Sequence, residues 1–121
     1  MEHSSPPLWS GLLARLDADA TARRCVAANR RKIAEELARV LVDDFGVRRV
    51  WLFGSLARGG IGGKLDIDLA VEGLDETLEL SAWSAVDARA GTRVDLVRLE
   101  TASDRLRAVI RQEGVLLHER D

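Results

Sequence analysis

The chain has little that would cross-link it or hold it in a membrane. Cys25 is the only cysteine among 121 residues, so no intramolecular disulfide can form and a reducing cytosol is the expected compartment. No hydrophobic run approaches the roughly 20 residues of a membrane span. The first residues also lack the basic flank and apolar stretch of a signal peptide. We therefore expect a cytoplasmic protein with no membrane partner.

An excess of charge of one sign is also missing. Eighteen basic and twenty acidic residues give a formal net charge of −2, which provides no electrostatic footprint for direct nucleic-acid binding. Arginines cluster at Arg23-Arg24, Arg30-Arg31 and Arg48-Arg49, and these clusters could be solvated faces or line a basic groove. The composition, 46% hydrophobic and 31% charged, is that of a globular protein and argues against disorder. A chain of this length fits one domain with a modest core.

The apolar pattern predicts an α/β (α+β) fold. Residues 1–30 form an N-terminal extension with a short amphipathic helix, predicted from the helical spacing of Trp9, Leu12, Leu13 and Leu16. A second helix, from about Thr21, is expected to end at Gly46. Strands are predicted over 47–53, 65–71, 93–98 and 115–118, and further helices over 55–58, from Asp75 to about 90, and from Thr101 to Gly114. Residues 31–121 should thus form a two-layer domain with a mixed β-sheet, helices packed on one face and the other face partly open.

A Gly-Ser pair follows the first predicted strand and precedes a short helix. The first turn of a helix has unpaired N–H groups and a positive dipole end, so this arrangement suits a phosphate. Gly54 would let an anion approach the backbone, and the Ser55 hydroxyl would add a donor. A Gly-Ser pair after a strand is more often a plain turn, so this signal is weak alone.

Three acids follow on the next strands. Asp66 and Asp68 are separated by one residue, so in a strand they point the same way, roughly 6.6 Å apart along the backbone. Asp95 lies between apolar residues, and by alternation it faces the same side of the sheet. Three adjacent carboxylates need a counter-ion, and Mg²⁺ suits such oxygen ligands. A salt bridge from Asp95 to Arg93 or Arg98 is the alternative interpretation.

Three segments together resemble a known family: Leu52-Phe53-Gly54-Ser55-Leu56-Ala57-Arg58-Gly59, Asp66-Ile67-Asp68-Leu69-Ala70-Val71 and Val94-Asp95-Leu96-Val97. Over about residues 33 to 118 the chain resembles the minimal nucleotidyltransferase (MNT) domain of the DNA polymerase β-like nucleotidyltransferase superfamily. Many relatives have Ser where this chain has Leu65, and a polar or Pro-containing loop where it has Gly59, Gly60, Gly62 and Gly63. Neither departure removes a ligand.

The resemblance implies roles for individual residues. It assigns the triphosphate to Gly54 and Ser55, and Mg²⁺, as two ions, to Asp66 and Asp68. It assigns to Asp95 either completion of the metal site or help in deprotonating the acceptor. Arg58 could reach a phosphate, or it could close its short helix against an acid.

We accordingly expect a Mg²⁺-dependent nucleotidyltransferase that moves AMP from ATP to a protein hydroxyl. The short chain has no room for an acceptor domain, so the acceptor should arrive as a separate protein. The resemblance implies an antitoxin whose partner is a HEPN-domain ribonuclease toxin, with a toxin tyrosine as acceptor. Two alternatives stay open: a catalytically weak or inactive antitoxin that neutralises its toxin by binding, and a homodimeric nucleotidyltransferase acting on a small molecule such as an antibiotic.

Overall fold

The computed structural model describes residues 10–59 and 64–120. Its elements, in chain order, are α1 (Ser10–Phe45), β1 (Arg49–Phe53), α2 (Gly54–Ala57), β2 (Ile67–Glu72), the 3₁₀ turn η1 (Glu76–Leu78), α3 (Glu79–Ala90), β3 (Val94–Arg98), the 3₁₀ turn η2 (Leu99–Thr101), α4 (Asp104–Glu113) and β4 (Val115–Glu119). All four predicted strands are present. Trp9 and the loop glycines Gly60, Gly62 and Gly63 lie outside the described residues.

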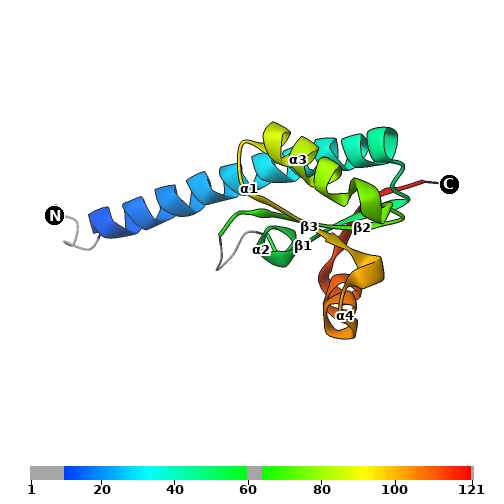
Figure 1. The fold of residues 1–121 in the computed structure, drawn as a ribbon. Helices are drawn as coiled ribbons and strands as arrows, with labels where there is room; N and C mark the ends of the chain where they lie inside the picture. The colour runs from blue at the N-terminus through cyan, green and yellow to red at the C-terminus, as the bar shows by residue number, and fades with distance from the viewer. Residues whose placement is uncertain (1–9, 60–63, 121) are drawn as a thin grey trace, which may run out of the picture.

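The strands form one mixed sheet in the order β3-β2-β1-β4. β1 runs antiparallel to both β2 and β4. β2 and β3 are parallel, since the α3 crossover lies between them in the chain. α1 and α3 lie together on one face of this sheet (Figure 1). The predicted α+β class and mixed sheet are therefore confirmed.

The main core lies between the sheet and the α1–α3 layer. Alternate strand residues point into it, so β1 has an alternating burial pattern. Large, fully buried members come from α1, β1, α2, β2, α3 and β3: Leu37, Leu41, Leu52, Leu56, Ile67, Leu69, Val86 and Val94. The alternate residues of the same strands lie on the opposite face of the sheet, among them Trp51 and Phe53 as well as Asp68.

α1 is one continuous helix, so the prediction of two N-terminal helices was wrong. The helix spans 36 residues. The segment 17–21, where a break was expected, contains aspartate, alanine and threonine but no glycine or proline, so nothing there stops the helix. The N-terminal half projects beyond the sheet (Figure 1), and the first buried residue of its described part is Ala27. Leu12 and Leu16 are 50% and 53% exposed.

α4 lies on the other face of the sheet, over β1 (Figure 1), which the prediction of helices on one face does not include. Ile110 of α4 and Ala70 of β2 are both buried there, outside the main core cluster. The cap of α4 is Ser103, whose Oγ accepts a hydrogen bond from the Leu106 N–H at 3.1 Å. Thr101, the predicted cap, instead ends η2. No helix in the described part of the chain is long and apolar enough to cross a bilayer.

Candidate active site

The end of β1 brings the Gly-Ser pair against the acidic strand. Gly54 begins α2 with a φ of +77°, a conformation that favours glycine. A Cβ added at Gly54 would collide with the carboxylate of Asp68, so the Gly54 backbone lies directly beside that side chain. The two halves of the sequence motif, separated by ten residues of chain, are therefore in contact.

Ser55 links the two halves a second time. Its hydroxyl donates a hydrogen bond to the main-chain carbonyl of Lys64, shortly before the acidic strand. This bond fixes α2 relative to the start of β2. Because the Ser55 hydroxyl is engaged in this bond, the groups of this segment that suit an anion are the N–H groups of the first turn of α2.

Asp68 and Asp95 face each other across neighbouring parallel strands. They are register partners of β2 and β3, and Phe53 of β1 pairs with Asp68 from the other side. Burial, followed by the charge of Asp95, raises the pKa of Asp68 from its ordinary 3.8 to about 6. A hydrogen bond with Asp95 and the more distant charge of Asp66 act in the same direction. The pair is thus an electrostatically costly arrangement that a cation would relieve.

Asp95 also has a basic neighbour, as the salt-bridge interpretation expects, while its part in a metal site stays a prediction. Arg93 Nε lies 3.5 Å from Asp95 Oδ1, although the arginine side chain is mostly exposed. The Arg93 charge slightly opposes the rise in the Asp68 pKa. The position of β3 is fixed from the helical side, where Trp83 Nε1 donates to the Val94 carbonyl at 2.7 Å. No pattern in the sequence indicates this contact, because it depends on how α3 packs on β3.

Asp66 is not part of the Asp68–Asp95 pair. It precedes β2, is half-buried, and lines a hollow of about 480 Å³ beside α1, together with Arg23, Arg30 and Lys64. Within residues 10–59 and 64–120, no three histidine, cysteine or acidic side chains come close enough to form a metal cluster. The structure therefore brings together Asp68 and Asp95, and leaves Asp66 as a neighbour of this pair.

The donor set fits a divalent cation. Asp68 and Asp95 offer hard carboxylate oxygens, and Mg²⁺ usually binds one or two carboxylates and completes its shell with waters and substrate phosphates. Arg58, the other predicted ligand of phosphate, instead pairs with Glu113 of α4 at 3.3 Å, and both side chains are about half exposed. This contact corresponds to the second of the two interpretations of Arg58.

A mixed sheet with a Gly-Ser turn against paired strand carboxylates defines a nucleotidyltransferase type of fold and site. The family model described as "Polymerase beta, Nucleotidyltransferase" matches residues 35–121. The chain belongs to this polymerase β nucleotidyltransferase family. A comparison with curated proteins finds no match.

Solved structures with the same fold include toxin–antitoxin complexes. A toxin–antitoxin crystal structure with AMP-PNP is 28% identical with a TM-score of 0.61, and the match covers 70% of this chain and 73% of that chain. A minimal nucleotidyltransferase is 29% identical with a TM-score of 0.55, over 75% of this chain and 91% of that chain. The MNT antitoxin complex with a tri-AMPylated HEPN toxin from Shewanella oneidensis, 24% identical with a TM-score of 0.60 over 74% and 72% of the chains, shares the fold.

Proposed function

We propose that this protein transfers AMP from ATP to a hydroxyl of a partner protein, with Mg²⁺, and that the acceptor is a tyrosine of a HEPN-type toxin for which this chain is the antitoxin. The observation that carries the proposal is the contact of Gly54 with Asp68, which itself faces Asp95. The toxin–antitoxin structure with AMP-PNP, 28% identical, supports both the nucleotide and the kind of partner.

In this proposal, one group of residues binds the triphosphate and its cation, and Asp95 acts on the acceptor hydroxyl. The backbone at Gly54 and the start of α2 bind the triphosphate, because a glycine there leaves no side chain between the amides and an anion. Asp68 and Asp95 would hold Mg²⁺, which supplies charge stabilisation to an in-line displacement at the α-phosphorus. Asp95, nearest the sheet edge, accepts the proton of the attacking hydroxyl. Pyrophosphate is the leaving group.

The small-molecule alternative has less support. Among the hollows lined by described residues that we compared, none combines an enclosed volume with both acids of the pair, so they give no support to a small acceptor. A partner protein brings its acceptor hydroxyl without such a pocket.

The test is transfer in vitro to a co-expressed HEPN-type partner. The purified pair is incubated with ATP and Mg²⁺, and the partner is analysed by mass spectrometry for added adenylyl groups. Asp68→Asn should lower transfer by at least about 100-fold, since it removes half of the cation site. Asp44→Asn, an exposed acid of α1, is the matched control and should transfer normally. Full transfer by Asp68→Asn would show that the metal site is wrongly assigned.

A further inference from the structure

The main chain around Asp66 is held in place by a side chain from α1. Asp66 precedes β2, so the strand ladder begins only at the next residue, Ile67, whose N–H donates to the Arg93 carbonyl at 3.0 Å. The carbonyl directly before Asp66, that of Leu65, accepts a hydrogen bond from Nη1 of Arg30 at 2.7 Å. This bond joins α1 to a segment 35 residues later in the chain. The proposed transfer uses neither Arg30 nor this contact.

Arg30 faces the sheet because of its place on α1. It lies three residues after Ala27 and four before Ala34, which are both buried, and residues at this spacing share one face of a helix. Ala27 is the first buried residue in the described part of this helix, so Arg30, itself half-buried, lies where α1 begins to pack on the sheet. The core periodicity of α1 therefore directs this arginine toward the chain that enters β2.

The bond engages the main chain before Asp66 and not its carboxylate. Arg30 and Asp66 line the same hollow beside α1, yet among the described residues no ion pair joins them. A guanidinium bound to the carboxylate would occupy the oxygens that a cation needs. The Asp66 charge also contributes to the raised pKa of Asp68, so these two carboxylates act on each other. Arg30 thus fixes the backbone of Asp66 and leaves its carboxylate to its acidic neighbours.

Asp95 is held in a similar way. Trp83 of α3 donates from Nε1 to the carbonyl of Val94, directly before Asp95. The carbonyls before Asp66 and before Asp95 are therefore each bound by a side chain of the α1–α3 layer. Asp68, by contrast, lies within the ladder between β1 and β3 and is held by its strand. Both helices of this layer thus help to orient an acid.

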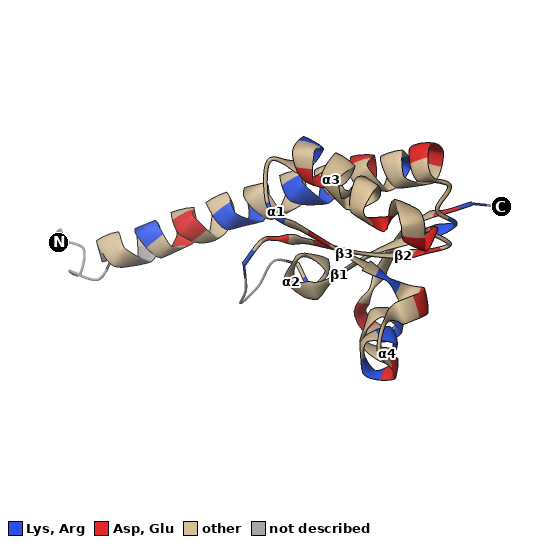
Figure 2. Cartoon of the chain, viewed as in Figure 1, with Lys and Arg blue, Asp and Glu red and all other residues tan. Residues whose placement is uncertain are grey.

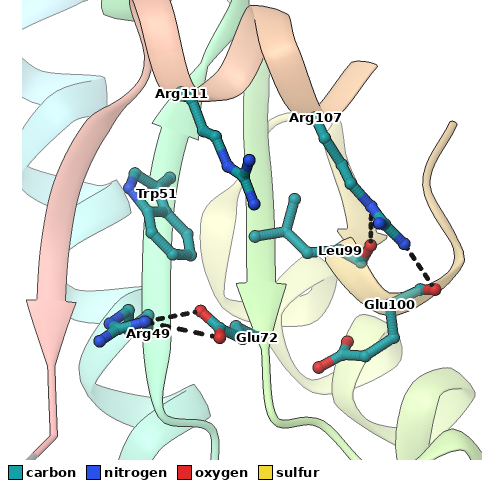
Figure 3. A pocket seen from close by; sticks show the side chains of 7 residues that line it. All are labelled: Arg49, Trp51, Glu72, Leu99, Glu100, Arg107 and Arg111. Carbon is teal, nitrogen blue, oxygen red and sulfur yellow. Dashed lines mark hydrogen bonds and ion pairs between the residues drawn. The ribbon is translucent and has the colours of Figure 1, made fainter. Parts of the chain in front are cut away.

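Arg107 makes the same kind of bond elsewhere in the molecule. It lines the hollow at Trp51, between α4 and the strands, and donates to the main-chain carbonyls of Leu99 and Glu100 at 2.8 and 2.9 Å (Figure 3). These carbonyls belong to η2, which follows the end of β3 remote from Asp95. Arg107 is therefore a matched reference, a guanidinium–carbonyl contact that holds the fold away from the acids.

We propose that Arg30 is a positioning residue for Asp66. By binding the carbonyl before it, Arg30 keeps Asp66 where its carboxylate can join Asp68 and Asp95 around a divalent cation. Arg30 contacts no reacting atom and acts only through Asp66. It precedes residues 35–121, which the family model matches, so the site depends on a part of α1 outside that match. This inference rests on the proposed function.

The first test measures binding of Mn²⁺ alone by electron paramagnetic resonance, without nucleotide or partner. Arg30→Met keeps the apolar stem but removes the donors, so it should weaken Mn²⁺ binding roughly tenfold. Arg30→Lys keeps the charge and a donor and should restore most of the affinity. Arg107→Met loses the same kind of bond and should bind Mn²⁺ like the unmodified protein. Unchanged binding by Arg30→Met, or no Mn²⁺ binding by the unmodified protein, would overturn the proposal.

A double-variant cycle tests whether Arg30 acts through Asp66. Asp66→Asn alone should weaken Mn²⁺ binding, and adding Arg30→Met should cause no further loss, because the residue that Arg30 positions has already lost its charge. A further loss as large as that of Arg30→Met alone would show that Arg30 acts independently of Asp66, against the proposal.

Hydrogen exchange in EDTA tests the positioning without any metal. The Ile67 amide, the first of the ladder, should exchange several-fold faster in Arg30→Met, because the segment before it is no longer held. Arg107→Met should leave the exchange of this amide unchanged. Equal exchange at Ile67 in all three proteins would show that the bond to Leu65 does not hold the segment.

Transfer to the partner separates this inference from the proposed function. At saturating ATP, Arg30→Met should need about tenfold more Mg²⁺ for half-maximal transfer, whereas Arg107→Met should show the parental Mg²⁺ dependence. Parental Mg²⁺ dependence in Arg30→Met, with transfer intact, would overturn the positioning role and leave the proposed function standing. Arg30-dependent Mn²⁺ binding without any transfer by the unmodified protein would refute the proposed function and leave the positioning role standing.

Discussion

At the scale of single residues, Asp68 bears the largest electrostatic cost in the site. It is half-buried opposite Asp95, and desolvation with this like charge raises its pKa to about 6. In neutral solution without metal, the ionised side chain therefore opposes folding. Because solvent screens a half-exposed group, we put the cost at about 1 kcal/mol.

Replacing this charge should stabilise the metal-free protein. Asp68→Asn removes the repulsion, and its amide can donate to Asp95, so the melting temperature in EDTA should rise by about 3–5 °C. Mg²⁺ should raise the melting temperature of the unmodified protein but not that of the variant. Calorimetry measures both shifts, with Asp44→Asn as the exposed control. A variant that melts below the parent and responds equally to Mg²⁺ would contradict this account.

Gly54 is a second residue where stability and activity are coupled. Gly54→Ala should lower both stability and transfer activity. An alanine is strained at this positive φ, and its Cβ would displace the Asp68 carboxylate. Gly46 provides a matched control: its φ is +70°, yet a Cβ there meets nothing within 4 Å. Gly46→Ala should cost only about 1–2 kcal/mol of unfolding free energy and keep transfer activity. Urea denaturation and the transfer assay separate the two contributions; equal behaviour of the two variants would exclude the contact with Asp68.

Strand alternation predicted which site residues share a face of the sheet, but only for residues that lie within a strand. Alternation placed Asp68 and Asp95 on one face, and the register confirms that they are partners. Alternation also placed Asp66 on this face, within a strand predicted from residue 65, but β2 begins at Ile67, so the ladder does not hold Asp66 there. Pairing of Arg58 with an acid was one of the two interpretations of this residue, but its partner Glu113 was not predictable, since the pair depends on α4 crossing to the second face of the sheet.

At the scale of elements, α1 shows where periodicity misleads. Helical spacing correctly marked Leu12 and Leu16 as helical, but spacing cannot say whether an apolar stripe has something to pack against. A 36-residue helix is about 54 Å long, while the five-residue β1 spans about 17 Å, so the sheet covers only part of it. Figure 2 shows basic and acidic bands alternating along the projecting part.

The projecting half of α1 should therefore contribute little to stability. The double variant Leu12→Ser, Leu16→Ser should change the unfolding free energy by no more than about 1 kcal/mol, because both side chains are half exposed. Leu37→Ala, on the same helix but 1% exposed, should cost about 2–5 kcal/mol. Urea unfolding at two protein concentrations measures both. A large, concentration-dependent loss in the double variant would mean that this half packs against a second copy.

At the scale of the whole molecule, the domain presents two different surfaces to a partner. The open sheet face carries Asp68, Asp95 and the hollow at Trp51, whereas α1 projects with Leu12 and Leu16 exposed. In the proposed function the first surface modifies a partner, whereas the second has no catalytic groups and could only bind one. Transfer and masking thus map onto separate parts of the chain and can be tested separately.

Rescue of cells that express the HEPN-type partner distinguishes these two modes. If transfer neutralises the toxin, the double variant Asp66→Asn, Asp68→Asn should fail to restore growth, while Asp44→Asn restores it fully at equal protein level. Because the changes to asparagine keep side-chain size and remove only charge, binding through the exposed face of α1 should persist, and co-purification of the variant with the toxin should be unchanged. Growth restored by the double variant would show that masking suffices. The acids near Gly54 would then be dispensable for neutralisation.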